Sequence, residues 1–332
     1  MTTQTPQAAF AVSLGDLQQA HERIRPHIVR TPLLESEPLN RLLGGRILVK
    51  AECLQNAGAF KFRGACNRLL QLSTAQRQAG VVAFSSGNHA LAISAVARKF
   101  GVPATIIMPA DAPKAKIEGS RANGATVILY DRHKDDREAI GSEIAGRTGA
   151  VVVPPYDDPD VMAGQGTVGL EILEQAEALG VTLDAVIAAS SGGGLVAGVA
   201  TAVKSLSPAT EVYAGEPAGF DELARSLASG QAESNAPGAQ SICDSLQVVS
   251  PGKLTFPINL HLLSGSLIVN DDEVRQAMKV AYQHLKLVVE PGGAVPLAAL
   301  LAGKLAVAGK TVALVLSGGN VDTNVFVEAL GR

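Results

Sequence analysis

Aromatic residues and excess positive charge are scarce in this 332-residue sequence, which has no tryptophan, 4 tyrosines, 8 phenylalanines and a formal net charge of −3. Surfaces that bind nucleic acid combine basic stripes with stacking rings, so we expect no nucleic-acid partner. Three cysteines, Cys53, Cys66 and Cys243, lie far apart in the sequence. They predict neither a metal cluster nor a disulfide framework, and a cytoplasmic location is expected.

Long apolar runs are also missing. No uninterrupted apolar stretch approaches the roughly 18 residues of a membrane-spanning helix, and residues 1–16 lack the basic and apolar regions of a signal peptide. We therefore expect no membrane contact. Hydrophobic residues make up 47% of the sequence and charged residues 18%, which excludes a disordered, highly charged chain. At about 150 residues per domain, the length predicts two domains.

Short β-branched runs alternate with helical patterns in the middle of the chain. Residues 81–84, 104–108, 125–130 and 150–153 are too uniformly apolar for half-exposed strands and are typical of a parallel sheet covered on both faces. The helical stretches between them are about 10–15 residues long, which is the rhythm of βαβ units. This block predicts a small open α/β domain over residues 76–155.

A second series of elements follows this block. Strands are expected at 184–189, 211–216 and 311–317. Helices are expected at 164–179 and 194–206. The strand-like residues 46–53 are expected to join the second sheet, which makes the small domain an insertion into a large domain of residues 1–75 and 156–332. The predicted fold class is α/β, with two open, mostly parallel twisted sheets flanked by helices.

Three polar, glycine-rich turns follow predicted strands, at 85–89, 190–194 and 317–320. The first two open helices, whose N-terminal N–H groups and dipole favour an anion. Three consecutive glycines at 192–194 allow the backbone to surround a phosphate with its N–H groups. In open α/β sheets, ligands bind at the carboxyl ends of strands. A plain capping turn without a ligand is the alternative for each turn taken singly.

Lys61 stands between Phe60 and Phe62. Apolar neighbours lower the pKa of a lysine amine and make it nucleophilic, although a solvent-exposed lysine is the common alternative. Together with the three turns, this lysine indicates a phosphorylated cofactor that is attached through an amine. Pyridoxal phosphate (PLP) has the phosphate and the aldehyde that this arrangement requires.

The order of several motifs resembles that of the fold-type II PLP enzymes, specifically the threonine/serine dehydratase and serine racemase family. The matching segments run through most of the chain and include KAECLQNAGAFKFRGA, SSGNHA, AGQGTVGLEI, SSGGGLVAG, KLVVEPGGA and LSGGNVD. The resemblance implies a tryptophan synthase beta-like fold, with a movable small domain and PLP in the cleft between the two domains.

The resemblance also implies roles for individual residues. Lys61 corresponds to the lysine that binds PLP covalently, and Phe60 corresponds to a residue beside the cofactor ring. Asn88 matches the asparagine at the ring hydroxyl, and Ser317 matches the residue that faces the pyridine nitrogen. The loop that binds the cofactor phosphate corresponds to Ser191, Gly192, Gly193, Gly194 and Leu195. The loop that receives the substrate carboxylate corresponds to Ser86, Gly87, Asn88 and His89.

The implied activity is that of an ammonia-lyase that converts a β-hydroxy amino acid of the L-threonine or L-serine type into a 2-oxo acid and ammonia, with Lys61 removing the α-proton. Ser86 stands where racemases of the family have an acid/base, so a serine racemase is one alternative. Leu91, Tyr156 and Ser245 depart from the family pattern, so phenylserine or 3-hydroxyaspartate is an alternative substrate. A nucleotide-binding oxidoreductase would need GxGxxG with a later acidic residue, which is missing.

Members of this family also hold a divalent cation. The resemblance implies that its ligands are Glu216, the carbonyl of Phe220 and Glu222, a donor set that suits Mg²⁺ or Ca²⁺. A solvated acidic helix start is the alternative.

A homo-oligomer, either a dimer or a tetramer, is expected. Only 12 residues follow Asn320, too few for the regulatory domain of biosynthetic threonine deaminases, so a short catabolic type of enzyme is expected.

Overall fold

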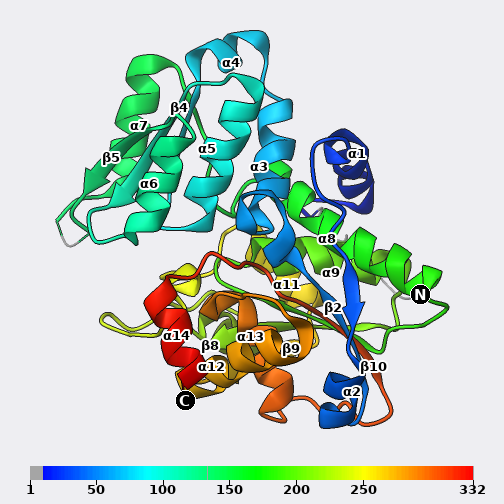
Figure 1. Cartoon of the computed structure of the whole chain (residues 1–332). Coiled ribbons are helices and arrows are strands. Elements are labelled where there is room, and N and C mark those ends of the chain that lie inside the picture. Colours follow the sequence, from blue (N-terminus) through cyan, green and yellow to red (C-terminus); the bar gives the residue numbers. More distant parts are fainter. Residues whose placement is uncertain (1–9, 133, 332) are drawn as a thin grey trace.

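Two separate sheets organise the computed structural model, which describes residues 10–132 and 134–331 (Figure 1). The six-stranded sheet has the order β1-β2-β10-β7-β8-β9, in which β1 is antiparallel to β2 and the other pairs are parallel. Its strands are β1 (Leu33–Glu35), β2 (Arg46–Lys50), β7 (Ala185–Ala189), β8 (Glu211–Pro217), β9 (Gly265–Val269) and β10 (Thr311–Val315).

The second sheet is parallel throughout and has the order β5-β4-β3-β6. Its strands are β3 (Val81–Phe84), β4 (Ala104–Pro109), β5 (Thr126–Tyr130) and β6 (Val151–Val152). They lie between β2 and β7 in the chain, yet they form a sheet of their own. The predicted α/β class with two mostly parallel sheets is therefore confirmed.

Helices cover both sheets. They are α1 (Leu14–Ile24), α2 (Glu37–Leu43), α3 (Lys61–Leu70), α4 (Thr74–Ala79), α5 (Asn88–Phe100), α6 (Lys114–Ala122), α7 (Arg137–Thr148), α8 (Pro159–Ala178), α9 (Gly194–Leu206), α10 (Glu222–Ser229), α11 (Thr255–Leu262), α12 (Asp271–Val280), α13 (Pro291–Leu301) and α14 (Thr323–Gly331). Short 3-10 turns are η1 (Glu52–Leu54), η2 (Asn56–Gly58) and η3 (Asp244–Leu246), and a π-helical turn, η4 (Ala281–Leu285), follows α12. No helix of this described part is long and apolar enough to cross a membrane.

Apolar side chains on both faces of each strand explain why both sheets are covered. In β2, Val49 packs with the apolar face of α13, whereas Leu48 packs on the opposite face with α8 and α9. In β3, Ala83 packs towards α5 and Phe84 packs towards α7. Each fully buried Leu, Val or Phe side chain contributes roughly 1.5–3 kcal/mol to folding. Burial on two faces is the reason for the uniformly apolar runs in the sequence.

The two parts of the molecule meet around α3 and α8. In Figure 1 the four-stranded sheet and α4 to α7 form one group, and α3 lies between this group and α8. The two helices cross closely, because a Cβ at Gly164 would lie 2.6 Å from the Cα of Gly64. Neither position has room for a side chain. The domain boundaries at 75/76 and 155/156 and the mobility of the small domain remain predictions.

Several element boundaries differ from the predicted ones. The helix predicted over 164–179 begins earlier, at Pro159, because the Asp158 side chain accepts the Val161 N–H at 2.9 Å and caps the helix start. The strands β1 and β9 were not predicted. Their sequences, LLE and GSLIV, are too short or too close to the preceding apolar helix α11 to stand out as separate periodic segments.

Candidate active site

One cavity lies where the loops that follow β3, β7 and β10 meet. The predicted cofactor and substrate residues that line it are Phe60, Lys61, Ser86, Gly87, Asn88, His89, Ser191, Gly192, Gly194, Leu195 and Ser317. Gly193 belongs to the same loop but lies outside the lining. The fold thus places Phe60 and Ser317, which are 257 positions apart in the sequence, in the wall of the same cavity.

Lys61 is the first residue of α3, and its ammonium group donates a hydrogen bond to the carbonyl oxygen of Pro155. The nitrogen lies 5.1 Å from the centroid of the Phe60 ring. Burial lowers the pKa of the Lys61 amine to about 8. The expected second apolar neighbour, Phe62, does not line the cavity, because its side chain is buried in the core cluster that α3 shares with α5 and the small sheet. Successive helical residues point about 100° apart, which separates Phe62 from Lys61.

The glycine loop after β7 directs its carbonyl groups away from the cavity. The carbonyl of Gly192 accepts the Thr255 hydroxyl at 2.5 Å, and that of Gly193 accepts the Asn259 amide at 3.3 Å. The first N–H groups of α9, which begins at Gly194, have no partner within the helix. A Cβ at Gly192 would lie 2.3 Å from ring atoms of Tyr156. This loop is therefore a backbone cradle that only glycine can form, with donors for a phosphate.

The loop after β3 joins a helix start to the large sheet. Asn88 is the first residue of α5; its amide donates to Glu290, and its oxygen accepts the Asn320 amide at 2.9 Å. His89 is 1% exposed, and its Nε2 lies 2.9 Å from the carbonyl of Val153. Burial first, and the positive charge of Lys61 second, lower the pKa of His89 to about 3. The imidazole is therefore neutral.

Ser317 follows β10 and is 5% exposed. Its carbonyl accepts the N–H of Phe60 at 3.0 Å, and Ala59 forms a bridge with Gly318. These contacts hold the segment before Lys61 against the end of β10. A Cβ at Gly318 would lie 2.3 Å from Glu290 Oε1, so this turn also requires glycine.

A cluster of ionisable groups borders the cavity and was not predicted. Lys116, from α6, is buried and lies 2.6 Å from Asp244 Oδ2 and 3.9 Å from Glu290 Oε2. Burial raises the pKa of Glu290 to about 7, although the charge of Lys116 acts in the opposite direction. Burial alone would lower the pKa of Lys116, but the two carboxylates outweigh it and raise the pKa. Lys116 thus connects α6 with η3, through Asp244, and with the start of α13, through Glu290.

Arg137, the first residue of α7, also lines the cavity and was not predicted. Its guanidinium lies 5.4 Å from the centroid of the Phe84 ring. Within residues 10–132 and 134–331, it has no carboxylate at ion-pair distance. The charged sequence around it, DRHKDDRE, resembles a solvated surface and gives no local signal of a site.

The predicted metal residues lie away from this cavity. Glu216 and Glu222 are both fully buried. Glu216 accepts the N–H groups of Leu223 and Ala224, each at 2.8 Å, and so caps the start of α10. Glu222 Oε2 accepts the Asn235 amide at 2.6 Å, whereas its Oε1 is buried without a hydrogen-bond partner in the described structure. Burial raises the pKa of Glu216 to about 7 and that of Glu222 to about 8.

Geometry and donors together fit PLP. The cavity offers an amine of lowered pKa, and a glycine cradle at a helix start faces it. An unpaired cradle of N–H groups suits a phosphate, and the amine suits an aldehyde. The fold and the site therefore define an enzyme of the PLP-dependent class.

Comparison with known proteins identifies the family. The family model described as pyridoxal-phosphate dependent enzyme matches residues 24–318, and the chain belongs to that family. The chain is 42% identical to serine racemase of Arabidopsis thaliana over 318 residues, which cover 94% of each protein. It is also 42% identical to L-threo-3-hydroxyaspartate ammonia-lyase of Saccharomyces cerevisiae, with 93% of each covered. Among solved structures, the threonine deaminase of T.th. has a TM-score of 0.88 and 44% identity, covering 93% of this chain and 99% of that one.

Proposed function

We propose that the protein is a PLP-dependent ammonia-lyase that converts a β-hydroxy amino acid into a 2-oxo acid and ammonia. The observation that carries the proposal is the position of the Lys61 amine, which shares one cavity with the glycine loop after β7 and with the helix start after β3. The known activities of the relatives, ammonia-lyase, deaminase and racemase, all involve the bonds at Cα of a small amino acid.

Each group in the cavity has a part in this chemistry. The N–H groups of the glycine loop and Leu195 would hold the cofactor phosphate, and the Lys61 amine would hold its aldehyde carbon. Bound PLP supplies an electron sink that acidifies the α-proton of the amino acid. The N–H groups at the start of α5 receive the α-carboxylate. Ser317 lines the cavity and would offer the cofactor ring a neutral hydroxyl instead of a carboxylate, which would favour elimination over transamination.

The proposed reaction removes one proton and one hydroxyl group from the substrate. The amine of Lys61, whose pKa is lowered to about 8, accepts the α-proton, and this proton and the β-hydroxyl together leave the substrate as one water molecule. The resulting enamine adds water and releases ammonia and the 2-oxo acid. The net change is the hydroxy amino acid becoming one 2-oxo acid and one ammonium ion.

One residue of the cavity wall, Arg137, supports a substrate that has a carboxylate in its side chain. Arg137 offers a guanidinium at the cavity wall, and no carboxylate of the described residues neutralises it. A guanidinium binds a carboxylate through two parallel hydrogen bonds. We therefore propose 3-hydroxyaspartate as the preferred substrate, ahead of threonine, serine and phenylserine. A panel of these amino acids, scored for 2-oxo acid, tests the order, and a higher kcat/KM with threonine, serine or phenylserine than with 3-hydroxyaspartate would contradict it.

Serine racemisation is a second candidate activity. Ser86 lines the same cavity as Lys61, and its hydroxyl has no hydrogen-bond partner within the described part of the chain, whereas the neighbouring Ser85 hydroxyl accepts the Gly87 N–H. A free hydroxyl can return a proton to the face of Cα that Lys61 does not reach. We expect Ser86→Ala to lower D-serine formation from L-serine at least 10-fold, the effect of losing a positioned acid, while 2-oxo acid formation changes far less. Equal losses of the two products would contradict this role.

We further propose that Glu216, the carbonyl of Phe220 and Glu222 hold Mg²⁺ or Ca²⁺. Glu222 Oε1 is buried without a hydrogen-bond partner among the described residues, and the nearby charge of Glu216 also raises the pKa of Glu222. This supports the site, because two neighbouring buried carboxylates need a cation or protons. The cation would fix the start of α10 rather than take part in the chemistry.

Addition of Ca²⁺ or Mg²⁺ to chelator-treated protein is expected to raise Tm, because an ion at about 100 times its Kd stabilises by about 2.7 kcal/mol. The effect should be lost in Glu222→Gln and retained in Glu233→Gln, whose side chain is half exposed and pairs with Arg225. An unchanged Tm in the wild-type protein, or an equal rise in Glu222→Gln, would exclude this site.

The homo-oligomer and the cytoplasmic location remain predictions.

A further inference from the structure

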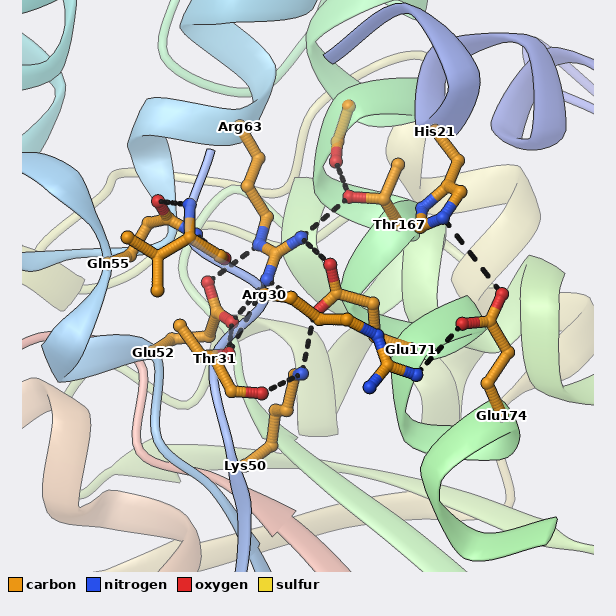
Figure 2. A network of polar contacts seen from close by, with 12 residues as sticks. His21, Arg30, Thr31, Lys50, Glu52, Gln55, Arg63, Thr167, Glu171 and Glu174 are labelled. Atoms are coloured by element: carbon orange, nitrogen blue, oxygen red, sulfur yellow. Dashed lines mark hydrogen bonds and ion pairs between the residues drawn. The ribbon is translucent and has the colours of Figure 1, made fainter. Parts of the chain in front are cut away.

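A buried network of charges lies directly behind the start of α3 and contacts neither the cavity nor the solvent (Figure 2). Its centre is Arg63, which is 0% exposed and lies two residues after Lys61. Figure 2 shows the Arg63 guanidinium between the carboxylates of Glu52 and Glu171, with Lys50 on the far side of Glu171. The proposed reaction gives none of these four residues a role.

Arg63 and Glu52 form a fork-to-fork pair. Arg63 Nε lies 2.8 Å from Glu52 Oε2, and Nη2 lies 2.8 Å from Glu52 Oε1. Two parallel hydrogen bonds fix direction as well as distance, which a single contact does not. The pair joins the two ends of the segment 52–63, and Lys61 lies within the segment that it closes.

The remaining donors of Arg63 attach this closed segment to α8. Nη1 and Nη2 each lie 2.8 Å from an oxygen of Glu171, and Nη1 also donates to the Thr167 hydroxyl at 3.2 Å. Burial alone would lower the pKa of Arg63, but Glu52 and Glu171 outweigh it and raise the pKa. Burial alone would raise the pKa of Glu171, but Arg63 and Lys50 lower it. The Arg63 guanidinium is therefore held in its charged form between two carboxylates.

The Arg63–Glu52 pair links the two ends of segment 52–63, in addition to hydrogen bonds that the segment makes with its neighbours, such as those of the Gln55 side chain with the backbone of Val29. The segment contains two 3-10 turns and the first residues of α3, and Ala57 adopts a left-handed conformation with φ of 56°, which is unfavourable for a residue with a Cβ. On its other side, Phe60 donates to the Ser317 carbonyl and Ala59 pairs with Gly318. Lys61 is thus held between an anchor at β10 and the Arg63–Glu52 pair.

We infer that Arg63 is a positioning residue, and that its paired contact with Glu52 holds the Lys61 amine where it meets the cofactor aldehyde and the α-proton. A buried ion network adds little stability compared with apolar side chains of similar volume, so stability alone is a weak reason for four buried charges here. Placement of a reacting group matters more, since a shift of about 1 Å costs about 100-fold in rate. The inference rests on the proposed role of Lys61.

Two variants disrupt the paired contact between Arg63 and Glu52, one by changing each residue. Arg63→Lys keeps the charge and loses the fork, and Glu52→Gln leaves Arg63 paired with Glu171. In the purified holoenzymes we expect kcat to fall 10- to 100-fold while KM changes less than threefold. We also expect borohydride to fix a smaller fraction of the bound cofactor to Lys61. If Arg63→Lys fails to fold, Glu52→Gln carries the same test.

Lys50→Met is the matched control. Lys50 is equally buried and belongs to the same network, but its amine contacts Glu171, Gln175 and the carbonyl of Thr31 instead of Arg63. This variant should lower Tm with unchanged kcat and cofactor fixation. If kcat instead falls in proportion to Tm in all three variants, or stays at the wild-type value in Arg63→Lys and Glu52→Gln, the inference is overturned. Mapping of the fixed cofactor in the wild-type protein tests the role of Lys61 separately.

Discussion

Replacement of Lys61 with alanine is expected to lower turnover of every substrate by about 10³-fold or more, because the change removes both the covalent anchor of the cofactor and the base at Cα. The glycine loop still offers its N–H groups, so the variant should still bind PLP through the phosphate, but more weakly. Borohydride treatment followed by peptide mass spectrometry should find the cofactor on Lys61 in the wild-type protein and on no residue of the cavity in the variant.

A surface lysine supplies the control for this experiment. Lys99 is exposed in the last turn of α5, at the end of the helix opposite to the cavity. Lys99→Ala should retain wild-type turnover and cofactor labelling. Turnover by Lys61→Ala within about 10-fold of the wild-type rate, or labelling of a different lysine in the wild-type protein, would remove Lys61 from the mechanism.

Replacement of Arg137 with glutamine is expected to lower kcat/KM for 3-hydroxyaspartate by about 10- to 100-fold and to change kcat/KM for serine less than threefold. Hydrogen bonds to charged groups contribute roughly 1.5–3 kcal/mol, and 1.4 kcal/mol is a factor of ten. The guanidinium lies at the cavity wall without a carboxylate partner among the described residues, so only a substrate with a second carboxylate would use it. The preference between the two substrates should therefore fall by the same factor.

Arg132→Gln is the matched control, because Arg132 lies five residues earlier and pairs with Asp111 outside the cavity. It should leave both values of kcat/KM unchanged. If Arg137→Gln lowers serine and 3-hydroxyaspartate turnover equally, Arg137 contributes to the cavity in general and does not select a side-chain carboxylate.

The part of the site that could be predicted from sequence is the part encoded locally. A glycine run between a buried strand and a buried helix has few structural roles besides an anion cradle, and Gly192 and Gly194 line the cavity as that pattern suggests. The same holds for Asn88 at the start of α5. The lowered pKa of the Lys61 amine agrees with the prediction from sequence, and burial causes it. Phe62, which the sequence suggested as a cause, packs into the core instead.

The residues that sequence reasoning missed depend on contacts between distant segments. Lys116 meets Asp244 across 128 positions, and Arg63 meets Glu171 across 108. No periodicity or motif in the sequence predicts such ion pairs, because a charged residue on a helix is usually exposed to solvent. Arg137 was missed for the same reason, because it stands in a charged stretch of the sequence. The strand β9 was missed because its five residues follow an apolar helix without a clear break in pattern.

The most direct measurement of the central claim is the release of ammonia and 2-oxo acid from L-threo-3-hydroxyaspartate by the purified, PLP-loaded protein. Elimination at the Lys61 cavity predicts that the two products appear in equal amounts, at a rate proportional to protein concentration and far above that of PLP alone. If neither product appears above the PLP blank with this substrate, or with serine or threonine, the proposed ammonia-lyase function is wrong.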